Sequence, residues 1–210
     1  ISSDLGLTNS IPYFVVLDDT RDVEVTPYRF QHRGAALKTK YRQRWDHSDL
    51  HAVLYAGSLN TFKKNRENVA AIDALFNTRL GDGWDVKLGA RRASQDTFMR
   101  RYNFNSDTWL KSSATAERIK PDRYYYVEAS DAQSLSASTA ADHQTTILPF
   151  MFYEDIKPGF RNSQNLKTEI SAIQLDNDEG HDMSRWVGNI ELIDQVGGGN
   201  LRTELRTALI

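Results

Sequence analysis

Residues 36–45 read Ala-Leu-Lys-Thr-Lys-Tyr-Arg-Gln-Arg-Trp, and this stretch decides the fold class. Side chains on a strand point alternately to opposite sides, so a strand here gathers its basic side chains on one face. The basic face holds Lys38, Lys40, Arg42 and Arg44, and the other face holds Leu37, Thr39, Tyr41, Gln43 and Trp45. A helix would scatter the four cations around its circumference. The stretch therefore predicts a β-strand of about ten residues.

The same alternation continues in other parts of the chain, notably in residues 70–80 and 84–91. Turn-forming residues separate the alternating stretches, as in Gly81-Asp82-Gly83 and Lys120-Pro121-Asp122. Continued through the sequence, this pattern predicts about twelve strands in one antiparallel up-and-down sheet. No internal repeat or linker interrupts the pattern, so residues 1–210 are expected to belong to a single all-β domain.

The composition excludes several classes of protein. The 210 residues include no cysteine, which rules out disulfide frameworks, thiolate metal sites and cysteine nucleophiles. The net charge of −2 argues against a surface dominated by nucleic-acid binding. The longest apolar runs, residues 11–17 and 147–153, are far shorter than the ~20 residues of a membrane-spanning helix. A membrane barrel remains compatible, because its strands alternate and a mean hydropathy such as −0.57 is unremarkable for it.

No residue pattern indicates catalysis, a metal or a cofactor. The five histidines stand apart, mostly in or beside predicted turns, without the spacing of a metal site. They are His32, His47, His51, His143 and His181. The acidic stretch 176–182 lacks the spacing of a calcium loop, and the glycines at 197–199 precede a strand pattern rather than a helix. We therefore expect a protein that is not an enzyme, with no cofactor and no metal.

Two architectures fit the strand pattern. A soluble β-sandwich or barrel turns its apolar face inward and has strands of about five or six residues. A membrane barrel has longer strands, turns its apolar face to lipid, places aromatic residues near the interfaces and keeps a polar lumen. The long stretches, the aromatic residues near their ends and the charged opposite faces favour a transmembrane β-barrel. The alternatives are an unrelated porin or receptor barrel and, from a different class, a soluble β-rich carbohydrate-binding module.

The basic face of residues 36–45 has two interpretations. It is either a solvated strand face or a lumen wall that contacts an anionic ligand or partner. Like charges at alternate strand positions repel, so acidic side chains on neighbouring strands or a wet channel should accompany them. Glu24, Asp73 and Asp85 are the candidates for these counter-charges.

Two prolines interrupt otherwise convincing strands. Pro12 lies in the apolar run 11–17 and Pro27 lies between Thr26 and Tyr28, and each removes one hydrogen-bond donor from a sheet. The apolar phase also changes at the second proline, from odd-numbered to even-numbered positions, as a bulge produces. The prolines therefore indicate either two bulges or a seam that is weakened at the start of the sheet.

These prolines stand among motifs that resemble the barrel of the LptD family, the outer-membrane lipopolysaccharide-assembly proteins formerly called organic solvent tolerance proteins. The resemblance covers about residues 5–160 and rests on the order of several short motifs. The motifs are Pro12-Tyr13-Phe14, Asp22, Thr26-Pro27-Tyr28, Arg33-Gly34, Tyr41-Arg42, Asn65-Arg66, Gly83-Trp84, residues 94–98 and Leu148-Pro149. Two features depart from the family: its disulfide-forming cysteines are absent, and Gln95 rather than serine precedes Asp96.

The resemblance implies non-catalytic transport in the cell outer membrane. Proteins of this family receive lipopolysaccharide from a periplasmic, LptA-like bridge and release its lipid into the bilayer through a lateral seam between the first and last strands. An LptE-like lipoprotein plugs the lumen, and a periplasmic jelly-roll domain precedes a barrel that lies near the 26-strand end of the known range.

The resemblance assigns roles to parts of this chain. Pro12 and Pro27 match the lateral-gate prolines, and the basic face of residues 36–45 is expected to line the lumen. The chain ends within an alternating run, residues 201–209, so we expect it to be the N-terminal part of such a barrel. The implied partners are lipopolysaccharide, the plug, the periplasmic bridge and outer-membrane lipid, with no nucleic acid.

Overall fold

The computed structural model describes residues 5–60, 66–135, 145–159, 164–177, 181–196 and 199–209. The strands are β1 (Thr8–Ser10), β2 (Tyr13–Asp18), β3 (Arg21–Phe30), β4 (Gly34–Arg44), β5 (Ser48–Asn60), β6 (Arg66–Leu80), β7 (Trp84–Ala93), β8 (Trp109–Ile119), β9 (Arg123–Ser134), β10 (Thr145–Pro158), β11 (Gln164–Asn177), β12 (Met183–Val196) and β13 (Gly199–Leu209). The helix α1 spans Phe98–Arg101, and the 3-10 turn η1 spans Gly81–Gly83. Among the described residues, no helix has both the length and the apolar character needed to span a membrane.

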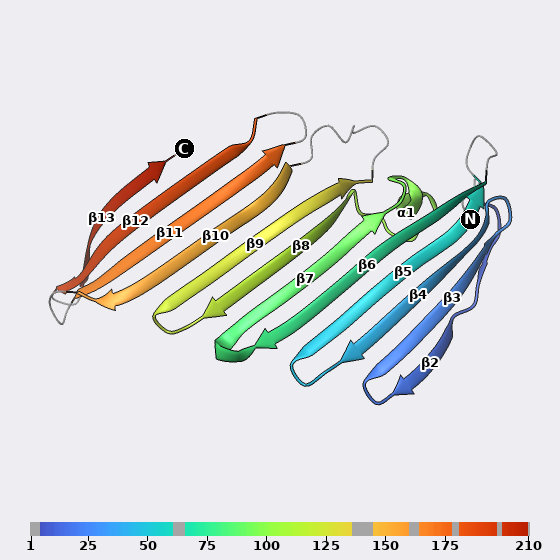
Figure 1. The fold of residues 1–210 in the computed structure, drawn as a ribbon, viewed down its shortest axis with the longest axis horizontal. Coiled ribbons are helices and arrows are strands. Elements are labelled where there is room, and N and C mark those ends of the chain that lie inside the picture. Colours follow the sequence, from blue (N-terminus) through green and yellow to red (C-terminus); the bar gives the residue numbers. More distant parts are fainter. Residues whose placement is uncertain are drawn as a thin grey trace. The chain divides into compact units, whose positions relative to one another are not determined.

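The strands follow one another through the sheet in chain order (Figure 1). β1 and β2 both pair with β3, so together they occupy the place of one first strand, and the sheet has twelve strand positions. The prediction of an all-β, antiparallel up-and-down sheet of about twelve strands is confirmed. Membership of the sheet in a membrane barrel stays a prediction.

Glycine and aspartate occupy backbone positions that most residues cannot adopt, in the predicted turn at residues 81–83 and at the start of β4. In η1, Asp82 and Gly83 both adopt left-handed backbone conformations, with φ of 63° and 81°. At the start of β4, Gly34 has φ of 107°, and a Cβ there would lie 2.5 Å from the carbonyl oxygen of Ser58. Only glycine fits such a position without displacing the neighbouring backbone. Gly34 therefore allows the start of β4 to lie close against the backbone of β5.

The chain divides into two compact units. The first comprises Ile1–Thr78, Lys87–Ser112 and Ala132–Asp142, and the second comprises Arg79–Val86, Ser113–Asp131 and His143–Ile210. The hydrophobic core of buried residues lies in the first unit. Its largest fully buried side chains are those of Phe30, Leu59, Phe98, Met99, Leu110 and Leu135.

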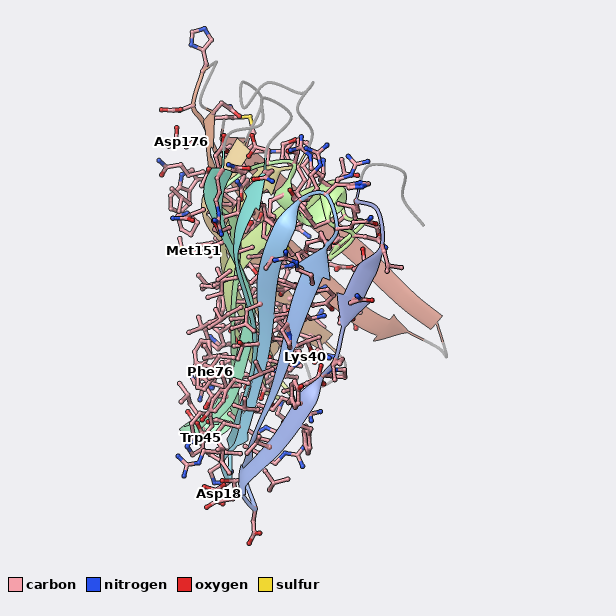
Figure 2. The ribbon with its side chains drawn as sticks, turned by 90° about the vertical axis from the view of Figure 1, so that its right-hand side faces the viewer. Asp18, Lys40, Trp45, Phe76, Met151 and Asp176 are labelled. Carbon is pink, nitrogen blue, oxygen red and sulfur yellow. The ribbon has the colours of Figure 1, made fainter. Side chains whose placement is uncertain are left out.

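The strands of the first unit have one charged and one apolar face. Residues that pair across antiparallel strands share a face, and the register places Lys40 opposite both Glu24 and Val53. The opposite face exposes large apolar side chains, among them Leu37, Trp45, Leu54 and Leu88. Figure 2 views the strands near their edge and shows Trp45 and Phe76 on one side and Lys40 on the other.

The second unit repeats this two-faced pattern. β9 to β12 pair in chain order, and β10 changes register between Ile147 and Phe150 against both of its neighbours. Pro149 lies within this irregularity, where it has no N–H to offer to the ladder. The register places several exposed apolar residues on one face. They are Val127, Met151, Ile170, Trp186 and Ile190.

Candidate functional site

The first strand of the sheet is interrupted at Pro12, beside the part of β3 that contains Pro27. β1 and β2 both pair with β3, and the offset between partner residues is the same from Thr8 to Val16, after which the register shifts before Asp18. Across the gap between them, this register sets Ile11 opposite Pro27 and Pro12 opposite Thr26. β1 and β2 are therefore two pieces of one strand whose pairing lapses where the prolines stand.

The two prolines remove donors on opposite sides of the first strand. The backbone N–H of Gln31 donates to the carbonyl oxygen of Leu7 at 3.0 Å, so these two residues point toward each other. Alternate residues of an antiparallel strand point their backbone groups to the same neighbour. Pro27 therefore faces the first strand, and Pro12 faces the outer edge of the sheet, and neither has an N–H to donate.

The interpretation of Pro27 as a bulge is wrong. β3 and β4 pair from Arg21 to Phe30 without any change of register. The apolar phase changes for another reason: Tyr28 and Phe30 lie on the charged face, where they pack against aromatic residues that follow β7. The pairing at Pro12 is also a gap in a continuous register rather than a bulge.

The two pieces of the first strand have different surroundings. Beside β1, Leu5 is buried in the hydrophobic core, and the backbone N–H of Leu7 donates to Oε1 of Gln31 at 3.0 Å. Every residue of β1 and of β2 is itself exposed, and the exposed fraction reaches 64% at Val16. The burial of Leu5, three residues before β1, therefore anchors that end of the first strand, whereas the β2 piece depends mainly on its backbone pairing with β3.

The basic strand predicted at residues 36–45 forms β4, and two of its cations are paired. Lys40 Nζ lies 2.8 Å from a carboxylate oxygen of Glu24, and Arg42 Nε lies 2.9 Å from one of Asp22. Lys38 Nζ lies 5.6 Å from the ring centroid of Tyr55, a cation–π contact. The fourth cation of this face, Arg44, lies at the exposed end of β4.

Of the three acidic residues predicted to balance the basic strand, only one pairs with it. Glu24 pairs with the basic strand as expected. Asp73 instead pairs with Arg91 at 3.1 Å, and Asp85 pairs with Arg79 at 3.1 Å. Asp22 was identified from the sequence only as a family motif and not as a counter-charge, although it lies opposite Arg42 on the neighbouring strand and forms the second pair.

An aromatic cluster covers one end of the charged face in the first unit. We call residues 94–108, which join β7 to β8, the α1 segment. Its Phe104 ring lies 5.0 Å from that of Tyr28 and 4.9 Å from that of Tyr55, and its Tyr102 ring lies 5.1 Å from that of Phe30. Phe98 is also fully buried here. The end of the charged face nearest β1 is thus packed with aromatic side chains.

Polar contacts fasten the α1 segment to the strands beside it. Arg91 donates to a carboxylate oxygen of Asp107 at 2.6 Å and reaches Asp73 with its Nε. Gln133 donates to the carbonyl oxygen of Ala93 at 2.8 Å and to Asp96 at 3.0 Å. Hydrogen bonds from Arg91, and then from Asn105, hold the pKa of Asp107 below its usual range.

The sequence patterns did not predict the packing of the α1 segment. Only residues 94–98 were identified there, as a family motif. The available signal was the spacing of Phe98 and Tyr102, which lie four residues apart and so share one face of a helical turn. Four residues of helix are too short for a recognisable apolar stripe.

In the second unit, a charged turn adjoins two aromatic rings. Asp82 in η1 accepts hydrogen bonds from Arg118 and Lys120. The Arg118 guanidinium carbon lies 5.8 Å from the Trp84 ring centroid and 5.7 Å from that of Tyr125. The hydrogen bond from Lys120 lowers the pKa of Asp82, and the charge of Arg118 adds to this effect. Trp84 thus stands at a strand end beside charged groups.

The histidines and the acidic stretch form no metal site among the described residues. His32, His47, His51 and His181 are exposed. His143 lies outside the described residues, as do residues 178–180 of the acidic stretch and residues 197 and 198 of the glycine-rich turn.

The chain matches no protein-family model and no curated protein. The resemblance to the LptD family therefore stays a prediction from the motifs themselves.

Proposed function

We propose that this chain forms part of the wall of an outer-membrane β-barrel that inserts lipopolysaccharide into the bilayer through a lateral gate at its first strand. This is the role that the resemblance to the LptD family implies. The transport is non-catalytic. In this proposal the protein resides in the cell outer membrane, receives lipopolysaccharide from an LptA-like periplasmic bridge and holds an LptE-like plug in its lumen.

One observation carries the proposal: the prolines weaken both sides of the first strand at the same level. Pro27 withholds a donor from the first strand, and Pro12 withholds one from the outer edge, where a closing strand would pair. Each missing hydrogen bond costs about 0.5–1.5 kcal/mol net, and more where lipid offers no replacement. A seam at this edge would therefore open more easily than any uninterrupted strand pair.

The two-faced strands support the proposed membrane location. A lipid-facing surface needs exposed apolar side chains, and Leu37, Leu54 and Leu88 supply them in the first unit. The opposite face bears Lys38, Lys40, Arg42 and Arg44, as a wet lumen permits. Because Lys40 and Arg42 are already paired with Glu24 and Asp22, an anionic sugar or plug would meet a largely balanced surface there.

The test is to restore the missing donors. In the protein as expressed from its own gene, the double variant Pro12→Ala, Pro27→Ala should strengthen the seam and reduce the amount of lipopolysaccharide that reaches the cell surface. Permeability of the outer membrane to a large antibiotic should rise in parallel. The control is Pro121→Ala, which removes a proline from the turn between β8 and β9. Unchanged surface lipopolysaccharide in the double variant would contradict the proposal.

The face assignment is tested by labelling. Since the chain has no cysteine, single cysteines at Lys40 and Leu54 give clean reporters of the two faces. A membrane-impermeant, water-soluble maleimide should modify Lys40→Cys, and a lipid-soluble maleimide should modify Leu54→Cys. Modification of Lys40→Cys by the lipid-soluble reagent alone would show that the faces are reversed.

A further inference from the structure

Two neighbouring strands of the second unit, β9 and β10, carry the same order of side chains on their exposed apolar face. The strands lie side by side (Figure 1), and three pairs of residues stand opposite one another on that face: Val127 and Met151, Tyr125 and Tyr153, and Arg123 and Asp155. Residues that pair across an antiparallel ladder share a face. Toward the turn between β8 and β9, the face therefore passes from exposed apolar side chains through two tyrosines to charged groups.

The tyrosines belong to a row of aromatic rings. The ring centroids of Tyr125 and Tyr153 lie 4.9 Å apart, and that of Trp84 lies 5.9 Å from that of Tyr125. An aromatic ring with a polar tip suits a boundary between an apolar and a polar medium. The order of side chains on β9 and β10 therefore matches the order of environments at a membrane surface, from hydrocarbon to water.

Beyond the tyrosines, a covered carboxylate holds two exposed cations. The Asp155 side chain is only 6% exposed, and it pairs with Arg123 Nε at 3.0 Å and with Lys157 Nζ at 2.9 Å. The side chains of Arg123 and Lys157 are 45% and 62% exposed. The negative charge of Asp155 is therefore shielded, whereas the two positive charges face the surroundings.

The turn between β8 and β9 adds further charges beside this group. Arg118 and Lys120 share the carboxylate of Asp82, and Asp122 lies 3.6 Å from Arg123 Nε. We call these charged residues the basic cluster: its cations are Arg118, Lys120, Arg123 and Lys157, and its carboxylates are Asp82, Asp122 and Asp155. The basic cluster as a whole carries an excess of positive charge.

The end of β2 and β3 in the first unit shows the opposite balance. A cavity beside the turn there is lined by four carboxylates and three arginines: Asp18, Asp19, Asp22 and Asp49, with Arg21, Arg42 and Arg44. Arg21 and Asp18 pair at 2.5 Å, and their side chains are similarly exposed. Positive excess beside a row of aromatic rings is therefore not a general property of the strand ends.

We propose that the basic cluster binds a phosphate group of a lipopolysaccharide molecule that lies against the outside of the sheet. Arg123 and Lys157 supply charge-assisted N–H donors for the phosphate. The rings of Tyr125, Tyr153 and Trp84 contact the apolar part of the same molecule.

The choice of lipopolysaccharide rests on the proposed function. A first strand that rises from a periplasmic domain places the turns after odd-numbered strand positions at the outer surface, and the turn between β8 and β9 follows the seventh position. The proposed gate delivers lipopolysaccharide to that side. Arg123 and Lys157 lie on strands other than those of Pro12 and Pro27, so phosphate binding there does not depend on whether the seam opens.

Photo-crosslinking detects the lipid at the basic cluster. The photoreactive residue p-benzoylphenylalanine replaces Tyr153 in the protein as expressed from its own gene and reconstituted into phosphatidylcholine nanodiscs that hold a small fraction of a test lipid. The first test lipid is diphosphoryl lipid A, the phosphorylated lipid part of lipopolysaccharide. Its crosslinking should exceed that of the same lipid without phosphates by about tenfold, because a charge-assisted hydrogen bond is worth at least a factor of ten.

Three results would overturn the proposal. Lipid A with and without phosphates could crosslink equally, or neither could crosslink. Phosphatidylglycerol at the same fraction could crosslink as well as diphosphoryl lipid A, which would show a site for phospholipids instead. The same photoreactive residue at Phe152, on the opposite face of β10, is the positional control and should crosslink none of the lipids.

A triple variant then tests the cations. Arg123→Gln, Asp155→Asn, Lys157→Gln removes both cations together with the covered carboxylate, so no buried charge is left without a partner. It should lower crosslinking of diphosphoryl lipid A at position 153 by about tenfold. The control Lys87→Gln, Arg185→Gln removes two exposed cations from the opposite face and should leave crosslinking unchanged. Undiminished crosslinking in the triple variant would contradict the proposal.

This readout is separate from lipopolysaccharide export. If Pro12→Ala, Pro27→Ala leaves export unchanged while position 153 keeps its preference for phosphorylated lipid A, the seam proposal fails and the phosphate site stands. If export falls and position 153 shows no such preference, the phosphate site fails and the seam stands.

Discussion

The two pieces of the first strand pair with the same neighbour and are both exposed along their length, yet only β1 has a buried core residue shortly before it in the chain. Next to β1, Leu5 is buried, and the facing residue Phe30 is only 1% exposed. Along β2, the large apolar side chains from Tyr13 to Leu17 are all about half exposed or more. This difference indicates that backbone pairing alone does not determine the stability of an edge strand. A buried residue beside the strand, here Leu5, also determines which piece is held in place.

The gap in the first strand lies at the boundary between its two pieces, which bears on how the proposed gate would open. The pairing lapses at Ile11 and Pro12, between the anchored piece and the exposed piece. A strand divided in this way can bend at the gap, so that β2 leaves the sheet while β1 keeps its contacts. In the proposed lateral gate, the gap would then act as the hinge and β2 as the moving part.

The largest expected effect removes the anchor of β1. Phe30→Ala deletes a fully buried ring from the core and should lower the free energy of unfolding by about 3–5 kcal/mol. The matched control is Phe14→Ala in β2, whose ring is 56% exposed and whose loss should cost far less. Denaturant titration of both variants measures the contrast. Equal losses of stability would show that the two pieces are held alike.

A smaller effect is expected from the ion pair that fastens the α1 segment. Asp107→Asn removes the charge that pairs with Arg91, and an exposed pair of this kind contributes about 0.2–1 kcal/mol. The folded state lowers the pKa of Asp107, so its contribution is present above the unfolded value of about 3.9 and is lost as the pH falls further. The wild type should therefore be slightly more stable than the variant at pH 7.

The pH dependence of the stability tests the same ion pair between Asp107 and Arg91. The stability difference between wild type and Asp107→Asn should shrink as the pH falls below about 4, because the wild-type carboxylate then becomes protonated. Hydrogen exchange should detect the loosening in the α1 segment and β1 rather than in β2. A difference that grows at acid pH would contradict the assigned role of the ion pair.

Much of the sheet was predictable because strand alternation is a local signal. The stretch 36–45 showed its basic face directly, and β4 forms there with that face intact. The turns at residues 81–83 and 120–122 separate strands as their residue types indicated. A β-strand in an antiparallel sheet needs only its own alternation and a nearby turn to be recognised.

The candidate site was less predictable because it depends on contacts between distant segments. The phase change near Pro27 has the sequence signature of a bulge, but it arises because Phe30 and Tyr28 meet Tyr102 and Phe104 of the α1 segment. Nothing near residue 27 in the sequence identifies partners more than 70 positions away. The prolines themselves were evident, whereas the outward direction of Pro12 required the register of the folded sheet.

The most direct test of the central claim locks one piece of the first strand at a time. Asn9→Cys, Arg29→Cys joins β1 to β3, and Val15→Cys, Val23→Cys joins β2 to β3. Both are directly opposed pairs on the same face, about 5.5 Å apart between Cα atoms, a separation that a disulfide spans. The measurement is surface lipopolysaccharide with the disulfide oxidised and after its reduction. We predict that the oxidised lock on β2 blocks export reversibly while the lock on β1 leaves export intact, and equal export from both locked proteins would contradict the account.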